Sequence, residues 1–321
     1  MLRLCLLILA ALALGSPALA SPPVPQKDID LYRGIARQVQ AGDSYYAAAV
    51  STQRASGYPV RPFYTVRQPT LSYVAATLGE RGLIALAYGT VMLGVLGWMR
   101  AIADRRRRLT MIALYAVASG AMISAATVYF TEVWCGLLTA VALGWRDWRI
   151  RLALVLAACL MREFAILLLL CLLAEATLRR RWIEASATAV VIAVAAVLLF
   201  LHATQVWKYT LPTDPVSQGW FRLRGPQGLV SDLRAVTVFG ILPMAAIYAA
   251  VAGALLGWAR YSLVHLLWFG GFCLMVMIAS RPDNYYWVQV MMPLLPAGLA
   301  FILGASGPRP PQAAPAAPLT P

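Results

Sequence analysis

The chain has 321 residues, of which 61% are hydrophobic and only 12% are charged, and its mean hydropathy is +0.70. A soluble domain needs about a quarter of its residues charged to cover its surface, so the composition excludes a soluble globular protein and predicts a chain that lies largely in a membrane. The net charge of +14 comes mostly from short basic clusters between apolar runs. Cytoplasmic loops of membrane proteins have this pattern, which argues against a nucleic-acid partner.

The first twenty residues contain a basic start, an apolar stretch and an Ala-x-Ala ending. This pattern is typical of a secretory signal peptide, and a retained first transmembrane helix is the alternative. In both cases residue 21 onward emerges on the outer face. Residues 21–81 are polar and rich in aromatic side chains, and we expect them to form a first periplasmic loop that carries short helices.

Apolar runs separated by basic clusters predict an all-α, polytopic transmembrane bundle over residues 82–306, with about eight full spans if the first segment is counted. Residues 202–237 are expected to form a second outer loop. The Pro- and Ala-rich residues 307–321 are expected to be a disordered cytoplasmic tail. The spans expected after the first segment cover residues 82–99, 109–129, 132–145, 184–201, 238–258, 263–280 and a last stretch that ends near residue 305.

Residues 152–177 are apolar except for Arg162 and Glu163 in the middle, and basic clusters flank both ends. A single span would place one of these clusters outside, against the positive-inside bias. A hairpin with its tip at the charged pair keeps both clusters inside. Its first arm, Leu152 to Met161, has only ten residues and reaches about 15 Å as a helix. We therefore expect a short, partly re-entrant hairpin.

Charged side chains inside a membrane are costly unless they are paired or hydrated, so they tend to be functional. Two interpretations of Arg162 and Glu163 remain open. Either they line a functional site, or Arg162 forms a structural ion pair with a residue such as Glu132 that holds the bundle together.

Carboxylates and basic side chains collect at the outer face of this topology. Carboxylates act as general bases and arginines bind phosphate through two-pronged hydrogen bonds, so a wet cavity lined by both would suit a lipid-phosphate substrate. Interfacial anchors and solvated loops are the alternative interpretation. The five cysteines lie in apolar runs with no Cys-x-x-Cys pair, and only two histidines are present. They predict neither a metal site nor a disulfide framework.

Two stretches of the first loop resemble a known family. Asp28-Ile-Asp30-Leu-Tyr32 is followed by Gly42-Asp43-Ser44-Tyr45-Tyr46, and Arg61-Pro-Phe-Tyr64 leads to Arg67-Gln-Pro69. This arrangement resembles the first outer loop of the C-type (GT-C) glycosyltransferases, multi-span enzymes that take a sugar from a polyprenyl phosphate. Arg162-Glu163 after a short hydrophobic arm, and Arg281-Pro-Asp-Asn284 before a Trp, are also similar to bacterial members. The likeness is best over the first 80 residues.

The resemblance implies an inverting transfer of a sugar to an envelope acceptor at the periplasmic face of a bacterial inner membrane. Asp30 is implied as the general base, with Asp28 as the second candidate. The expected partners are a polyprenyl-phosphate sugar lipid and membrane lipids, and no cofactor or metal is required. The residues implied to offset the charge of the departing phosphate are Arg67, Arg162, Lys208 and Arg281, and the supporting residues are Glu132, Glu163, Asp43 and Tyr32.

Two other classes of function remain open. A transporter or lipid flippase explains the re-entrant hairpin and the intramembrane charges equally well, but such proteins usually have duplicated halves, and no internal repeat is visible. A non-catalytic membrane scaffold subunit is the third possibility. A long outer loop with acids directly after the first segment favours the enzyme.

Overall fold

The computed structural model describes residues 26–303, so the predicted signal-like segment at 1–20 and the predicted tail at 307–321 lie outside the described residues. Within this range the chain is all-helical and has no β-strand, which confirms the predicted all-α class. The α-helices are α2 (Gln26–Gln40), α3 (Tyr45–Ala55), α4 (Thr70–Ala101), α5 (Arg105–Ala121), α6 (Thr131–Gly144), α7 (Trp148–Met161), α8 (Ile166–Leu178), α9 (Trp182–Tyr209), α10 (Gly225–Val236), α11 (Met244–Tyr261), α12 (Leu263–Ala279), α13 (Leu295–Gly298) and α14 (Ala300–Leu303). Short 3-10 helices are η1 (Phe63–Thr65), η2 (Thr127–Tyr129), η3 (Glu163–Ala165), η4 (Val238–Ile241) and η5 (Pro282–Val290).

Three helical segments of the described range are long and apolar enough to cross a membrane: Phe63–Ala101, which contains α4, and helices α9 and α11. The pair Pro282–Val290 and Leu295–Leu303, bent by 50°, adds a fourth if it forms one span. Helix α6 is apolar but has only 14 residues, which reach about 21 Å in a hydrocarbon layer about 30 Å thick. The helices are consistent with a membrane protein, but they do not confirm the predicted eight full spans.

Several boundaries differ from the prediction. Helix α4 begins at Thr70 rather than near residue 82, and it is interrupted at Gly79, where a φ of 66° requires a residue without a side chain. Helix α9 continues to Tyr209 and α10 begins at Gly225, so the expected outer loop 202–237 shrinks to residues 210–224. We call residues 210–224 the strap. The segment after α12 is the 3-10 helix η5.

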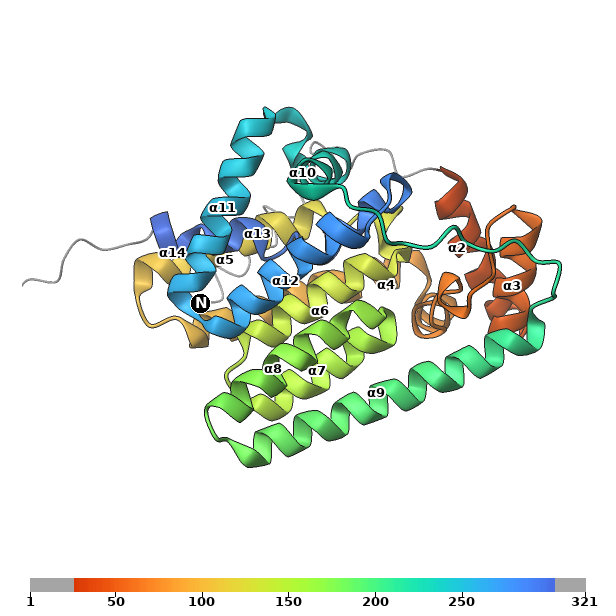
Figure 1. The fold of residues 1–321 in the computed structure, drawn as a ribbon, viewed down its shortest axis with the longest axis horizontal. Helices are drawn as coiled ribbons and strands as arrows, with labels where there is room; N and C mark the ends of the chain where they lie inside the picture. Colours follow the sequence, from red (N-terminus) through yellow and green to blue (C-terminus); the bar gives the residue numbers. More distant parts are fainter. Residues whose placement is uncertain (1–25, 304–321) are drawn as a thin grey trace, which may run out of the picture.

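The helices of the bundle place the basic turns and the first-loop helices at opposite ends. Figure 1 shows α2 and α3 together at one end, while the turns that precede α5, α7 and α9 lie at the other. At the basic end, Arg146 donates a hydrogen bond of 2.5 Å to the carbonyl oxygen of Ala101, and the Arg100 guanidinium lies over the Trp145 ring. The fold therefore separates a basic face from the face that carries residues 26–67.

Helix α6 lies at the centre of the bundle, and α9 lies along one edge (Figure 1). Every residue of α6 except Leu138 is buried. Helix α9 is almost as apolar, but only a few of its residues are buried and most of its side chains point outward. An apolar helix with an exposed apolar surface is consistent with contact to lipid.

Helices α7 and α8 are separated by a break at Arg162. Its φ of −154° and ψ of 131° are extended, so α7 ends at Met161 and the chain re-enters a helix only after η3. The two helices contact each other along their lengths (Figure 1). Of the charged pair noted in the sequence, the break buries Arg162 and leaves Glu163 partly exposed.

Candidate functional site

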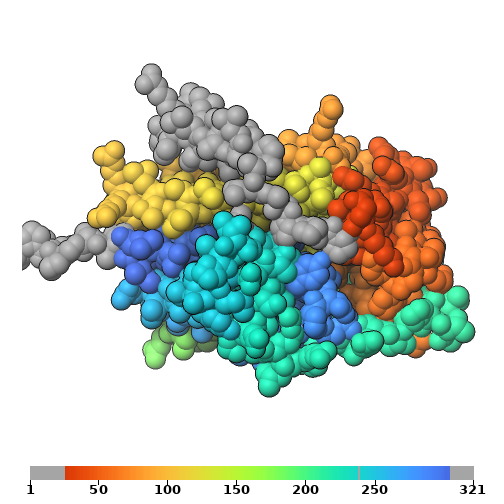
Figure 2. All heavy atoms as spheres, turned by 90° about the horizontal axis from the view of Figure 1, so that it is seen from above, coloured from red at the N-terminus to blue at the C-terminus, as the bar shows by residue number. Residues whose placement is uncertain are grey.

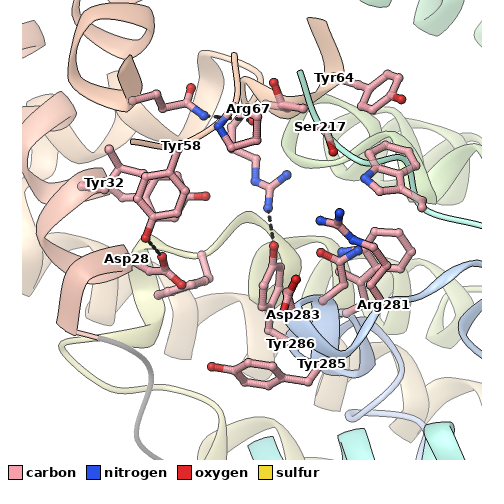
Figure 3. Close-up of a pocket in the computed structure, with 18 of the residues that line it drawn as sticks. Asp28, Tyr32, Tyr58, Tyr64, Arg67, Ser217, Arg281, Asp283, Tyr285 and Tyr286 are labelled. Carbon is pink, nitrogen blue, oxygen red and sulfur yellow. Dashed lines mark hydrogen bonds between the residues drawn. The ribbon is translucent and has the colours of Figure 1, made fainter. Parts of the chain in front are cut away.

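A cavity of about 480 Å³ lies at the end of the bundle where α2 and α3 pack (Figure 3). Its walls come from α2, the segment after α3, the break after α7, the strap and η5, so it joins parts of the chain that are far apart in sequence. Its charged lining residues are Lys27, Asp28, Arg67, Arg162, Arg281 and Asp283, and its aromatic lining residues include Tyr32, Tyr58, Tyr64, Trp220, Tyr286 and Trp287.

Asp28 is held in the cavity by a tyrosine from another element. The turn at Gly57, which has a φ of 72°, places Tyr58 so that its hydroxyl donates a hydrogen bond to Oδ1 of Asp28 (Figure 3). The Lys27 ammonium lies 4.7 Å from the centroid of the Tyr58 ring. Burial, together with the bond to Asp28, raises the pKa of Tyr58 well above its ordinary value of 10.0. The phenol therefore stays protonated and donates to the carboxylate at neutral pH.

Asp30, the first candidate base in the sequence, lies outside this cavity. It is exposed on α2, and its Oδ1 accepts a hydrogen bond of 2.7 Å from Nε2 of Gln26. Two residues along a helix correspond to a rotation of about 200°, so Asp28 and Asp30 point to different sides of α2. Ile29 and Leu31 are both buried, and the structure brings only Asp28 into the cavity.

Glu132 joins two arginines in the wall behind the cavity. Its Oε1 lies 3.0 Å from Nε of Arg162 and 3.2 Å from Nη2 of Arg67, and the side chains of Glu132 and Arg162 are at most 2% exposed. Arg162 also pairs with Glu163 at 3.2 Å. The structure thus contains the ion pair between Arg162 and Glu132 that the sequence suggested as a structural role. Arg67 donates a further hydrogen bond of 3.2 Å to the Tyr286 hydroxyl (Figure 3).

Arg281 lies on the other side of the cavity from Asp28 in the view of Figure 3. In the described part of the chain its guanidinium forms no ion pair, and its Nε is buried without a hydrogen-bond partner. Asn284 and Trp287 follow on η5 and line the same cavity. The amide nitrogen of Asn284 and the indole nitrogen of Trp287 are also buried, and neither has a hydrogen-bond partner in the part of the chain that the structure describes.

Aromatic rings form the wall next to Arg281. The centroid of Trp220, from the strap, lies 4.1 Å from that of Tyr64 and 5.5 Å from that of Trp287. Such packing gives a cavity a rigid apolar surface beside its polar groups. This combination of aromatic walls and a few directed polar groups is typical of small-molecule sites.

The strap is fixed at both of its ends. At one end Arg54 donates hydrogen bonds of 2.6 and 2.8 Å to the carboxylate of Asp214, and the backbone N–H of Ser217 donates to the carbonyl oxygen of Arg61 at 2.7 Å. At the other end Arg224 pairs with Asp232 at 2.7 Å. Trp220 lies between these two fixed points.

The other candidate residues lie in different places. Tyr32 lines the cavity, and burial raises its pKa to about 12. Glu163 is paired with Arg162, as described above. Lys208 is exposed near the end of α9, where its ammonium donates to Gln205. Asp43 lies in a separate hollow with Arg54 and Tyr209. The structure therefore brings Asp28, Tyr32, Arg67, Arg162 and Arg281 together, and it leaves Asp30, Lys208 and Asp43 outside.

Several cavity residues were not among the sequence candidates, including Tyr58, Trp220, Asn284 and Trp287. Tyr58 stands between Gly57 and Pro59, and Trp220 follows Gly219 in a polar stretch. An aromatic residue beside a turn residue in a long outer loop was the available signal. The same pattern also fits an ordinary turn.

Among residues 26–303 no group of three or more His, Cys, Asp or Glu side chains is placed to hold a metal ion. No protein-family model, curated protein or solved structure matches the chain. The functional conclusion therefore rests on the geometry of the site.

Proposed function

We propose that the chain is a membrane glycosyltransferase of the C type that moves a sugar from a polyprenyl phosphate to an envelope acceptor, with inversion, at the periplasmic face of a bacterial inner membrane. One observation supports this most strongly: a single cavity holds Asp28, fixed by Tyr58, and on its other side in the view of Figure 3 it holds Arg281, which forms no ion pair with the described residues. An inverting displacement needs a base near the acceptor hydroxyl and positive charge near the leaving phosphate on the opposite side of the sugar.

In this mechanism Asp28 takes the proton of the acceptor hydroxyl. Tyr58 holds Oδ1 of the carboxylate, which leaves the second oxygen to accept the proton. The acceptor oxygen then forms a bond to the anomeric carbon while the bond from that carbon to the phosphate oxygen breaks. The phosphate departs with the bonding electron pair, and the cavity's basic side chains stabilise its charge.

Asp283 is the other carboxylate in the cavity. It is exposed and follows Pro282 at the start of η5. We assign the base to Asp28 because a positioned hydrogen bond orients its carboxylate, and orientation is a large part of general-base efficiency. Substitution of Asp283 is therefore the comparison that distinguishes the two carboxylates.

We further propose that the cavity lies toward the periplasm and that the basic turns lie in the cytoplasm, with about eight crossing elements when the shorter apolar helices α6 and α12 and the α7–α8 hairpin are included. The positive-inside rule supports this orientation, because the basic turns lie at the end of the bundle opposite α2 and α3 (Figure 1). The exposed apolar surfaces of α9 and α11 offer contacts to lipid chains, including the prenyl chain of a donor.

The test uses the purified full chain in proteoliposomes with short-chain polyprenyl-phosphate hexoses and an envelope lipid extract. We expect wild-type protein to release the prenyl phosphate and to form a glycoside of inverted anomeric configuration. Asp28→Asn should lose this product, whereas Asp43→Asn, which changes a carboxylate outside the cavity, should keep it. Transport of the lipid or the sugar across the vesicle without any transfer would support a transporter instead.

A further inference from the structure

We infer that Arg281, Asn284 and Trp287 form an anion subsite for a phosphate ester, and that Arg67 and Arg162 do not bind the ligand's charge directly. This assignment divides these donor residues into two groups and leaves aside Lys27, the fourth basic residue of the cavity, whose ammonium lies over the Tyr58 ring. One group is engaged with carboxylates of the protein, and the other presents donors that the protein leaves without partners.

Both arginines of the first group are ion-paired with carboxylates of the protein, although Nε of Arg67 has no hydrogen-bond partner among residues 26–303. Glu132 takes one ion pair from Arg67 and one from Arg162, and Glu163 takes a second pair from Arg162. Arg67 also donates to the Tyr286 hydroxyl at 3.2 Å. If a ligand anion drew either arginine away from Glu132, the buried carboxylate would lose a partner. An uncompensated buried charge is strongly unfavourable. These arginines therefore position the wall of the cavity.

The second group has donors available. Asn284 is 6% exposed and Trp287 is 1% exposed, and both line the cavity. The amide nitrogen of Asn284, the indole nitrogen of Trp287 and Nε of Arg281 have no hydrogen-bond partner within residues 26–303. Buried donors without acceptors are unusual in native proteins and call for an explanation. Oxygens of a bound ligand would satisfy all three.

The chemistry of these donors indicates a phosphate ester. A guanidinium presents a fork of N–H groups that matches the oxygens of a phosphate, and the neutral donors Asn284 and Trp287 line the same cavity. Asp283 also lines the cavity, and its negative charge opposes an anion. It is exposed, however, so water screens its charge more strongly than that of a buried group.

The backbone of η5 is held firmly at the end that follows this subsite. Gly136 of α6 packs so closely against it that a Cβ there would lie 2.7 Å from the carbonyl oxygen of Gln289 and 2.9 Å from that of Val290. The Trp287 ring packs edge-to-face on Phe164 at 4.7 Å and on Trp220 at 5.5 Å. The donors are therefore placed by rigid packing before any ligand binds, which reduces the entropic cost of binding.

This inference rests on the proposed function for its place in a reaction, but anion binding is measured without transfer. Three probes are titrated into the purified full chain in detergent: geranyl phosphate, geraniol and inorganic phosphate. Intrinsic tryptophan fluorescence, to which Trp220 and Trp287 in the cavity wall contribute, reports binding, and a thermal-shift assay checks it. The variants are Arg281→Gln and Asn284→Ala, with Arg222→Gln as the matched control because Arg222 is exposed and does not line the cavity.

We expect geranyl phosphate to bind wild type and Arg222→Gln alike, and Arg281→Gln to weaken it by about tenfold or more. Asn284→Ala should weaken the binding of geranyl phosphate by a smaller factor. This variant provides the test if Arg281→Gln does not fold. Geraniol should bind weakly and equally to all of them. If inorganic phosphate displaces geranyl phosphate, the site recognises the anion itself. If it does not, binding requires the lipid ester.

Two results would overturn the subsite: geranyl phosphate affinity that stays within about twofold of wild type in both variants, or geraniol that binds wild type as tightly as geranyl phosphate. Persistence of sugar transfer in those variants would show that only the subsite is wrong. Arg281-dependent binding of geranyl phosphate in a protein that transfers no sugar would instead contradict the proposed function and leave the subsite intact.

Discussion

Glu132 and Arg162 form a buried ion pair of 3.0 Å that joins the start of α6 to the break after α7. Neither side chain is more than 2% exposed. The carboxylate of Glu132 also pairs with Arg67, which lies in the segment that leads into α4. One buried acid thus ties together three stretches of the chain that meet behind the cavity.

Removal of this acid should destabilise the protein strongly. Glu132→Gln leaves Arg67 and Arg162 without their shared carboxylate, and loss of one partner of a buried pair costs about 3–5 kcal/mol. Unfolding by SDS in mixed micelles measures the free energy. The matched control is Glu80→Gln, because Glu80 pairs with Arg33 at a partly exposed position, where a pair contributes about 0–1 kcal/mol. Equal losses for the two variants would contradict the structural role of Glu132.

The charged pair in the apolar run was the most informative part of the sequence. Charges in such a run need partners, and this requirement alone suggested Glu132 for Arg162. The choice between Asp28 and Asp30 had no comparable rule. It depends on which side of α2 faces the cavity and on Tyr58, which arrives from a turn thirty residues away. Tertiary contacts of this kind are not encoded in local periodicity.

The number of membrane spans also could not be predicted from the sequence pattern. Hydropathy marks apolar runs, but it does not show that α4 is broken at Gly79 or that the last apolar stretch bends by 50°. The helical part of the expected outer loop 202–237 was missed for a similar reason. Residues 225–236 are polar on one side and bury Leu229, Val230 and Leu233 on the other, so their mean hydropathy resembles that of a loop.

Tyr58 should remain a hydrogen-bond donor to Asp28 over a wide pH range. Burial and the bond to Asp28 raise the pKa of Tyr58 above 10.0, so its protonated, donating form persists as the pH rises. We therefore expect that deprotonation of Tyr58 causes no loss of transfer activity up to about pH 10. Tyr58→Phe should reduce the rate at every pH by about tenfold or more. Rate profiles of both proteins measure this. An alkaline decline near pH 8–9 that is present in wild type and absent from Tyr58→Phe would contradict it.

The fixed end of the strap should make stability depend on acid. The hydrogen bonds from Arg54 lower the pKa of Asp214 to about 2, from an ordinary value of 3.8. A carboxyl with a lowered folded pKa contributes stability above its unfolded pKa and loses it as the pH falls through the folded pKa. Asp214→Asn should therefore lower Tm at pH 6, and its difference from wild type should shrink between pH 4 and pH 2. A difference that grows in acid would contradict this account.

Close packing of α6 on η5 should make Gly136 intolerant of a side chain. A Cβ at this position would lie 2.7 Å from a backbone oxygen of η5, and such overpacking costs about 1–3 kcal/mol. Gly89 offers the control, because a Cβ there has no atom within 4 Å and Ala favours a helix over Gly by about 0.5–1 kcal/mol. Thermal unfolding should show a lower Tm for Gly136→Ala and an equal or higher Tm for Gly89→Ala. The reverse order would show that η5 moves easily.

The most direct test of transfer at Asp28 compares envelope glycans and lipids by mass spectrometry. A deletion strain is complemented with wild type, Asp28→Asn or Asp30→Asn at matched expression. Because Asp28 lines the cavity and Asp30 does not, we expect a sugar-bearing species that disappears on deletion to return with wild type and Asp30→Asn but not with Asp28→Asn. Full restoration of that species by Asp28→Asn would contradict the proposed mechanism.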